Sequence, residues 1–151
     1  MTEVDCLTEK LILVAGDPFA AQSRIQVSLP WFQEPGATGP PLLTVTAIWD
    51  TGASHTAFTS ALIKKLQLIR TRDGSYHTSG GKRSTVHYGA NIYLSHKLHF
   101  PFWEVMEADI HGGEVLLGMD IIGKGDFAIS NYPGDPIFSF RYPSQDRISF
   151  S

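Results

Sequence analysis

The chain contains one carboxylate whose neighbours could prepare it for acid–base chemistry. Residues 42–49 (LLTVTAIW) are apolar or β-branched, and Asp50, Thr51 and Gly52 follow them directly. A carboxylate at the end of such a segment is costly to bury unless hydrogen bonds or solvent satisfy it. Glycine permits a tight turn whose backbone amide can approach the carboxylate, and the Thr51 hydroxyl could hold the loop. The pattern therefore predicts one Asp presented at the base of a cleft, as a general acid or base.

Three landmarks along the chain resemble those of retropepsin-like aspartic proteases, the retroviral type. Residues 50–54 (DTGAS) match the active-site signature of that family, and residues 115–118 (VLLG) match a motif that packs beneath the active-site loop. Between them, residues 78–82 (TSGGK) fall where the family carries its flap, a hairpin that closes over substrate. The resemblance covers residues 42–130. The segments LLGMDII and GDFAIS look most like bacterial and cellular single-domain members.

The resemblance implies a role for each matching residue. It makes Asp50 the catalytic carboxylate, with Thr51 and Gly52 holding its loop. The residues that it implies for substrate binding are Ala53, Ser54, Ser79, Gly80, Gly81 and Lys82. The residues that it implies for the structural motif are Leu116, Leu117 and Gly118.

The chain departs from the viral enzymes at two positions. Those enzymes carry an acidic residue where this chain has Ser54 and an Arg where it has Met119, and the ion pair between them braces the viral dimer. This chain lacks both partners, so other contacts must hold a dimer together. Its flap is also less rich in glycine. Neither difference touches Asp50.

Peptide hydrolysis by this route needs two carboxylates that share one proton, one acting as base toward water and one as acid toward the substrate. Two carboxylates ~3 Å apart repel by about 5 kcal/mol at an effective dielectric constant of about 20, so the pair retains one proton. The chain has a single DTG segment, and Asp73-Gly74-Ser75 lacks the preceding apolar strand and is interpreted as a turn. The resemblance therefore implies a homodimer in which Asp50 meets its symmetry mate on the two-fold axis.

Residue 53 leads to a prediction about pH. Many two-lobed relatives have Ser or Thr after the glycine of DTG, and that hydroxyl can donate to the carboxylate and favour its ionised form. Ala53 cannot donate. We therefore expect activity at milder pH than in relatives that prefer acid.

The composition is that of a folded protein without a strongly charged partner. The chain has 151 residues, 42% of them hydrophobic and 18% charged, with a formal net charge of -3. This balance argues against disorder and against nucleic acid or an anionic membrane as the main partner. The single cysteine, Cys6, excludes an internal disulfide and favours a reducing compartment. With a polar N-terminal segment and no membrane-length apolar run, this predicts a cytoplasmic protein.

The same reading predicts no metal and no cofactor. The histidines His96 and His99 are poorly spaced for ligation, and no H-E-x-x-H motif or Cys pair is present. His55 follows the catalytic loop and has either an electrostatic or a structural role.

Period-2 alternation of apolar residues predicts a mainly β protein, and the resemblance implies a closed barrel with one or two short helices. We expect one domain over residues 1–151, with an N-terminal arm at 1–22, the family core at 42–130 and C-terminal strands at 131–151. The expected strands lie near residues 11–14, 25–29, 42–49 (buried on both faces), 86–94, 98–106, 115–118, 127–129, 137–142 and 148–150. A short helix is expected after Thr59 or Ser60, another near residues 118–122, and a mobile connection over residues 72–83.

Three alternatives remain open at this point. The chain could be a catalytically silent peptide-binding module with the same fold, or a precursor that cleaves its own arm at residues 1–22. The segment Ser79–Lys82 could be an ordinary solvated hairpin. For the enzyme, the expected partners are a second copy of the chain and an extended peptide. Residues 137–142 and 148–150 are the candidates for pairing across the two-fold axis, with an interface of about 2,000 Å² or more.

Overall fold

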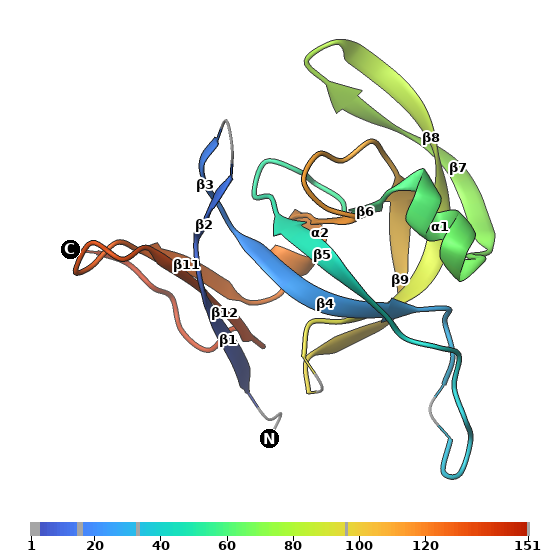
Figure 1. The fold of residues 1–151 in the computed structure, drawn as a ribbon, viewed down its shortest axis with the longest axis horizontal. Helices are drawn as coiled ribbons and strands as arrows, with labels where there is room; N and C mark the ends of the chain where they lie inside the picture. The colour runs from blue at the N-terminus through green and yellow to red at the C-terminus, as the bar shows by residue number, and fades with distance from the viewer. Residues whose placement is uncertain (1–3, 15–16, 33, 96, 151) are drawn as a thin grey trace.

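The chain folds into three β-sheets and two short helices within residues 4–14, 17–32, 34–95 and 97–150, which the computed structural model describes (Figure 1). The strands are β1 (Asp5–Lys10), β2 (Ile12–Val14), β3 (Asp17–Ala20), β4 (Gln22–Ser28), β5 (Leu43–Trp49), β6 (Ala57–Phe58), β7 (Arg70–Thr78), β8 (Gly81–Tyr93), β9 (His99–Glu107), β10 (Val115–Leu117), β11 (Asp126–Ser130) and β12 (Ile137–Tyr142). The helices are α1 (Ser60–Leu66) and α2 (Met119–Ile122). Neither helix is long and apolar enough to cross a membrane.

The largest sheet closes on itself around the main core. Its seven strands run in the order β4-β5-β10-β6-β9-β8-β7, and β4 also pairs with β8. That extra pairing joins the strands from β4 to β8 into a ring and leaves β7 on its outside. The fully buried residues of the ring include Val27, Ala47, Phe58, Ile92, Val105 and Leu117. The predicted mainly β, closed fold with one or two short helices is confirmed.

Strand β5 leads to the candidate catalytic loop. It is antiparallel to β4 and parallel to β10. Val45, Ala47 and Trp49 are buried on its inner face, whereas Thr44 is exposed and Ile48 half-buried. The strand was therefore predicted correctly, but its burial on both faces was not. The outer face is covered only in part, chiefly by the loop that precedes β10.

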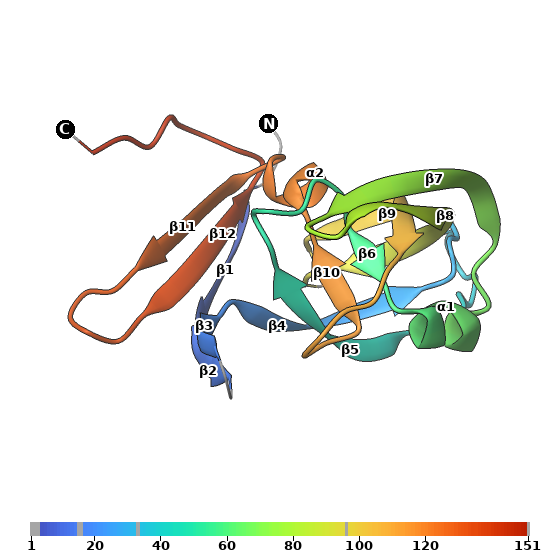
Figure 2. The ribbon, with the colours of Figure 1, turned by 90° about the horizontal axis from the view of Figure 1, so that it is seen from above.

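A second sheet packs against the ring, and Trp49 makes most of the aromatic contacts between them. Its order is β1-β12-β11, and Figure 2 shows it at one side of the ring, with the β11–β12 hairpin projecting outward. The Trp49 ring lies 5.5 Å from Phe127, 5.9 Å from Phe138 and 5.0 Å from Phe140, measured between centroids. The last residue before Asp50 thus anchors the terminal sheet to the ring.

The pairing within this sheet bears on the predicted dimer. Strand β12, residues Ile137–Tyr142, is central and pairs with β1 on one side and β11 on the other. Its backbone groups are therefore engaged inside one chain, and only β1 or β11 offers an edge to a partner. Residues 5–10 of the predicted arm form β1. Residues 148–150 were predicted to be a strand, which is wrong, because they form no sheet pairing and Phe150 is fully exposed.

Helix α1 follows its sequence signals. The Thr59 hydroxyl accepts a hydrogen bond from the Leu62 N–H at 3.3 Å, so Thr59 is the N-cap. Leu62, Ile63 and Leu66 are buried against the ring. Both the helix and its cap were predicted correctly from spacing.

The segment 72–83 was predicted to be a mobile connection, and this is wrong. Most of it belongs to the β7–β8 hairpin, in which Arg72 pairs with His87 and Thr78 pairs with Gly81. Its residues are largely exposed, so no buried alternation marks the strand in the sequence. Hydrogen bonding to β8, rather than burial of its own side chains, makes this segment a strand.

Candidate active site

The loop after β5 is held through its backbone. The Asp50 N–H donates to the Leu117 carbonyl at 2.9 Å, and the Ala53 N–H donates to the Asp50 carbonyl at 3.2 Å. The Gly52 N–H donates to the Asp50 carboxylate at 2.8 Å. A Cβ at residue 52 would lie 3.1 Å from that same Oδ1 atom, so glycine permits the close approach. Asp50 is half-buried, and Thr51 is exposed.

The motif at Leu116, Leu117 and Gly118 lies directly beneath this loop. Leu117 is fully buried and pairs with Trp49 in the parallel β5–β10 ladder. The next residue, Met119, donates its N–H to the Ala53 carbonyl at 2.7 Å. The chain around Gly118 therefore contacts the loop twice, through Leu117 at the end of β10 and through Met119 at the start of α2.

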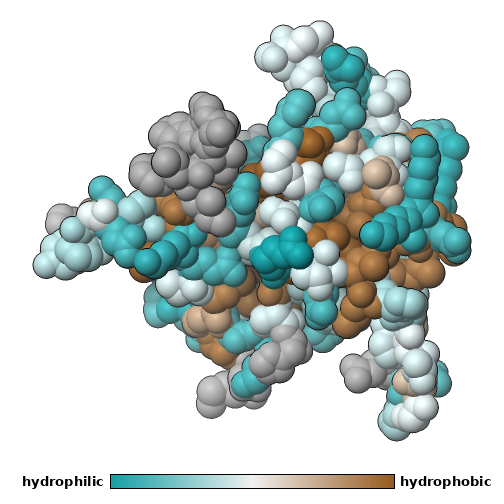
Figure 3. Space-filling model, in the orientation of Figure 1, coloured by the Kyte–Doolittle hydropathy of each residue, from teal (hydrophilic) through white to brown (hydrophobic). Residues whose placement is uncertain are grey.

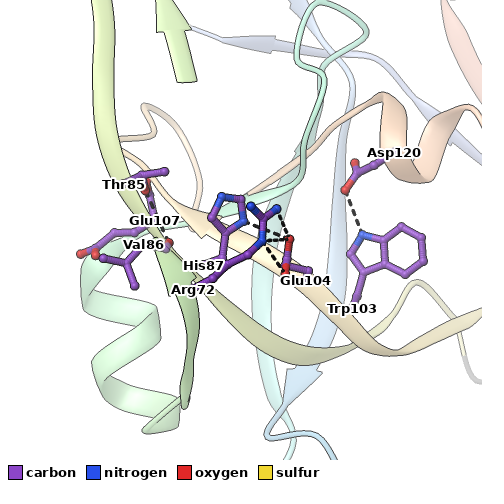
Figure 4. A network of polar contacts seen from close by, with 8 residues as sticks. All are labelled: Arg72, Thr85, Val86, His87, Trp103, Glu104, Glu107 and Asp120. Atoms are coloured by element: carbon purple, nitrogen blue, oxygen red, sulfur yellow. Dashed lines mark hydrogen bonds and ion pairs between the residues drawn. The ribbon is translucent and has the colours of Figure 1, made fainter. Parts of the chain in front are cut away.

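Buried polar contacts continue below the loop. The Thr56 hydroxyl accepts from the Gly118 N–H at 3.2 Å and donates to the Asp120 carboxylate at 2.8 Å. Asp120 also accepts from the indole N–H of Trp103 at 2.9 Å, as Figure 4 shows. Thr56 is fully buried, so these bonds satisfy its hydroxyl and link the loop to α2 and β9.

A cavity of about 430 Å³ opens beside Asp50. Its wall is formed by the candidate catalytic loop, the end of β7, and the end of β9 with the residues after it. The residues that line it are Asp50, Gly52, Ala53, Ser54, His55, Ala57, Ser75, Tyr76, His77, Thr78, Met106, Ala108, Asp109 and Leu116. The structure thus brings together five of the predicted residues, namely Asp50, Gly52, Ala53, Ser54 and Leu116.

The structure places Ser79, Gly80, Gly81 and Lys82 elsewhere, at the tip of the β7–β8 hairpin. All four are exposed, and none of them lines the cavity. The Thr78 hydroxyl accepts from the Gly80 N–H at 3.2 Å and donates to the Gly81 carbonyl at 3.1 Å. Gly81 has a φ of 111°, which favours glycine. In Figure 3 this tip projects at the top, with neutral to hydrophilic residues.

Sequence reasoning missed the strand segment that does line the cavity, Ser75–Thr78. The glycine pair at 80–81 marked the turn, but the polar residues before it were interpreted as loop. Met106, Ala108 and Asp109 were also missed. In sequence, residues that line a cavity at the end of a strand look the same as residues at any other strand end.

A second polar group lies behind the cavity, and Figure 4 shows it. The Arg72 guanidinium donates to the Glu104 carboxylate from Nε at 3.0 Å and from Nη2 at 2.6 Å. The Nδ1 atom of His87 lies 3.3 Å from the same carboxylate. The Arg72 hydrogen bond holds the pKa of Glu104 below its ordinary value. Burial, followed by the charge of Arg72, lowers the pKa of His87.

The site can do acid–base chemistry through Asp50. Among the residues that the structure describes, no group of three or more His, Cys, Asp or Glu side chains could hold a metal ion. One chain supplies one Asp50 carboxylate, and a cavity of about 430 Å³ lies beside it.

Comparison with known proteins identifies the family. A family model described as gag-polyprotein putative aspartyl protease matches residues 43–124, which is more than half of the chain. The chain therefore belongs to this retropepsin-like family of aspartic proteases. The match begins with β5 and ends just after α2, so it spans Asp50 and the glycine motif. No curated protein matches.

Two solved structures resemble the fold. A retropepsin-like aspartic protease from Rickettsia conorii superposes with a TM-score of 0.58 at 19% identity, covering 93% of this chain and 92% of that one. The EIAV protease in complex with the inhibitor HBY-793 has a TM-score of 0.43 at 25% identity, covering 53% of this chain and 75% of that one. The first likeness extends over nearly the whole chain.

Proposed function

We propose that the protein is an aspartic endopeptidase, in which two Asp50 carboxylates, one from each subunit of a homodimer, activate water. The observation that carries this proposal is the position of Asp50. Its carboxylate lies on the wall of a cavity of about 430 Å³, in a loop held by the Leu117 and Ala53 hydrogen bonds. In the assembled pair, one carboxylate takes the proton of water and the other protonates the substrate carbonyl.

The substrate in this proposal is an extended peptide that lies between the catalytic loop and β7. Strand β7 is the last strand of the large sheet and pairs only with β8 within the described chain. Its Ser75–Thr78 segment lines the cavity, so a peptide could add to this edge while its side chains enter the cavity. The tip residues Ser79–Lys82 would contact the peptide only after the hairpin moves toward the loop.

A homodimer is part of the proposal because one chain contains one DTG loop. Within the part of the chain that the structure describes, the terminal sheet has two edges without a neighbouring strand, at β1 and β11, and Ile129 on β11 is 60% exposed. We propose that one of these edges meets its symmetry mate. The exposed Thr51 belongs to the surface that would face the partner loop.

The test measures size in solution and then cleavage of a mixed peptide library. We expect a dimer that cleaves the library, and an Asp50→Asn variant that remains dimeric and loses cleavage. Asp73→Asn is the matched control, because Asp73 is exposed, lies outside the cavity and pairs with Arg70. A confirmed dimer that binds peptides and never cleaves them would make the protein a peptide-binding module. Equal cleavage by wild type and Asp50→Asn would refute the catalytic role.

A further inference from the structure

Arg72, His87 and Glu104 lie on one face of the β7–β8–β9 sheet, next to the cavity beside Asp50. Residues two apart on a strand share a face, so Arg72 and Gly74 lie together on β7, and Glu104 and Met106 lie together on β9. His87 on β8 pairs with Arg72 on one side and with Met106 on the other. The only buried imidazole of the described hairpin therefore lies beside the Arg72–Glu104 ion pair.

The His87 ring occupies space that a side chain on β7 would normally fill. A Cβ at Gly74 would lie 2.2 Å from the His87 Nε2 atom. The ring thus packs against β7 at Gly74 with its Nε2 and Cδ2 atoms nearest, and His87 is only 4% exposed. Any movement of the ring toward β7 must displace Gly74, and Ser75 follows Gly74 directly.

The position of this ring links it to the candidate active site. A cavity of about 250 Å³ borders it, lined by His55, Arg72, Gly74, Ser75, His87 and Met106. His55, Ser75 and Met106 also line the cavity beside Asp50. The His55 and His87 rings meet edge to face, with centroids 6.4 Å apart. The two cavities are therefore neighbours that share part of the β7 wall.

The charges around His87 favour its neutral form. Arg72 from β7, Glu104 from β9 and His55 from the catalytic loop face it. Glu104 attracts a proton on His87, but burial and the Arg72 guanidinium that binds the same carboxylate act more strongly in the opposite direction. Burial, Arg72 and His55 all lower the pKa of His87, and only Glu104 opposes them. A proton on His87 would place a second cation beside Arg72 in a buried position.

We propose that neutral His87 is a positioning residue, which packs against Gly74 and holds the Ser75–Thr78 segment beside Asp50, and that protonation of His87 releases this segment. The small cavity gives the protonated ring a polar space to enter, because its volume could hold several water molecules. As β7 moves, the wall of the substrate cavity moves with it.

The first test needs no catalysis. Hydrogen exchange of the Ser75–Thr78 amides is measured on the full-length Asp50→Asn protein at about pH 7.5 and about pH 4.5, corrected for intrinsic exchange. The lower pH is set well below the ordinary histidine pKa because burial and Arg72 lower the pKa of His87. We expect protection to fall roughly fivefold or more at the lower pH, the lower end of typical coupling between sites. The amides of β4 serve as an internal reference and should keep their protection. Protection of Ser75–Thr78 that does not change with pH would overturn the proposal.

Three variants separate positioning from simple stability. His87→Gln keeps a neutral polar group and should abolish the pH dependence, whereas His99→Gln, at an exposed site on β9, should retain it. Gly74→Ala should lower the protection of the Ser75–Thr78 amides at both pH values, as protonation of His87 does, because its Cβ displaces the His87 ring. The double variant Gly74→Ala/His87→Ala removes both the clash and the imidazole, so its protection should no longer depend on pH. A double variant whose protection still falls at the lower pH would overturn the proposal, even if His87→Gln failed to fold.

The kinetic form of this inference rests on the proposed peptidase function. In an active enzyme, lowering the pH through this range should raise KM more than it lowers kcat, and His87→Gln should remove the KM effect. If no cleavage occurs but exchange responds to His87, the peptidase proposal fails and the positioning proposal stands. If cleavage occurs but neither exchange nor KM responds to His87, the positioning proposal fails and the peptidase proposal stands.

Discussion

Gly118 lies so close to the backbone of His55 that a Cβ at residue 118 would stand 2.6 Å from the His55 carbonyl carbon. The same glycine donates its N–H to Thr56. The contact explains why a glycine follows the paired leucines of the motif. The polypeptide of the catalytic loop passes directly over β10, and no side chain fits between them.

The first prediction follows from this contact. Gly118→Ala should lower the free energy of unfolding by about 3 kcal/mol, the upper part of the usual range for overpacking, because backbone on both sides resists displacement. Urea unfolding measures it. Gly80→Ala is the matched control, since its Cβ meets nothing closer than 3.6 Å and its unfolding free energy should barely change. Equal losses in both variants would contradict the explanation.

The second prediction concerns Trp49, which packs on three aromatic rings of the terminal sheet. Trp49→Ala should cost about 3–5 kcal/mol and loosen β11 and β12 from the ring. Trp49→Phe keeps an aromatic ring and loses chiefly the 2.9 Å hydrogen bond from the indole to Ser23, so it should cost about 1 kcal/mol. Chemical unfolding of both variants tests this, and a similar cost for each would show that the ring contacts contribute little.

The third prediction concerns acid stability. Hydrogen bonds from Ser144 and Arg141 lower the pKa of Asp126 below its ordinary value of 3.8. A carboxyl whose pKa is lower when folded stabilises the protein above its unfolded pKa, and this contribution is lost as pH falls through the folded pKa. We therefore expect unfolding free energy to fall below about pH 3.8, and Asp126→Asn to flatten this decline.

The control for that measurement is Asp135→Asn. Asp135 is exposed and pairs with Lys10 at 3.5 Å, a contact that solvent and salt weaken. This variant should follow the wild-type decline with pH. If both Asn variants flatten the curve alike, general charge repulsion rather than the Asp126 contacts would explain the acid sensitivity.

The fourth prediction concerns the pH optimum of the proposed peptidase. Ala53 lines the cavity together with Asp50 and cannot donate a hydrogen bond from its side chain. Ala53→Ser introduces a hydroxyl that can donate to the carboxylate and favour its ionised form, so the optimum should move to lower pH. Rate profiles against pH for both proteins provide the measurement. An optimum that stays in place or rises would refute this role of residue 53.

Much of the fold could be predicted from residues with clear burial patterns. Thr59 and the apolar residues after it defined α1, because a cap and a buried stripe leave a direct signal in sequence. The polar strand Arg70–Thr78 left no such signal, since it is an exposed edge that pairs with β8. Residues 148–150 gave a false signal. Their apolar side chains suggested a strand, but no neighbouring strand pairs with them.

Part of the candidate site could likewise be predicted from the sequence, and part could not. Asp50 and the glycine motif were predicted because their chemistry is local, as in a carboxylate beside a glycine turn. The His87 group could not be predicted, because it joins residues from three strands whose alignment depends on hairpin register. Gly74 looked like a turn residue, and only the fold shows that it makes room for a ring.

The hydrogen bond from Asp50 to Leu117 links two parts of the chain that are synthesised far apart in time. The loop acquires its shape only when β10 lies beside β5, and the residues of β10 follow most of the sequence. Contacts between such distant segments close late in folding. A nascent chain that has not yet released residue 119 from the ribosome therefore cannot assemble this loop. If the proposed peptidase function is correct, unfinished chains carry Asp50 in a form that cannot cleave their neighbours.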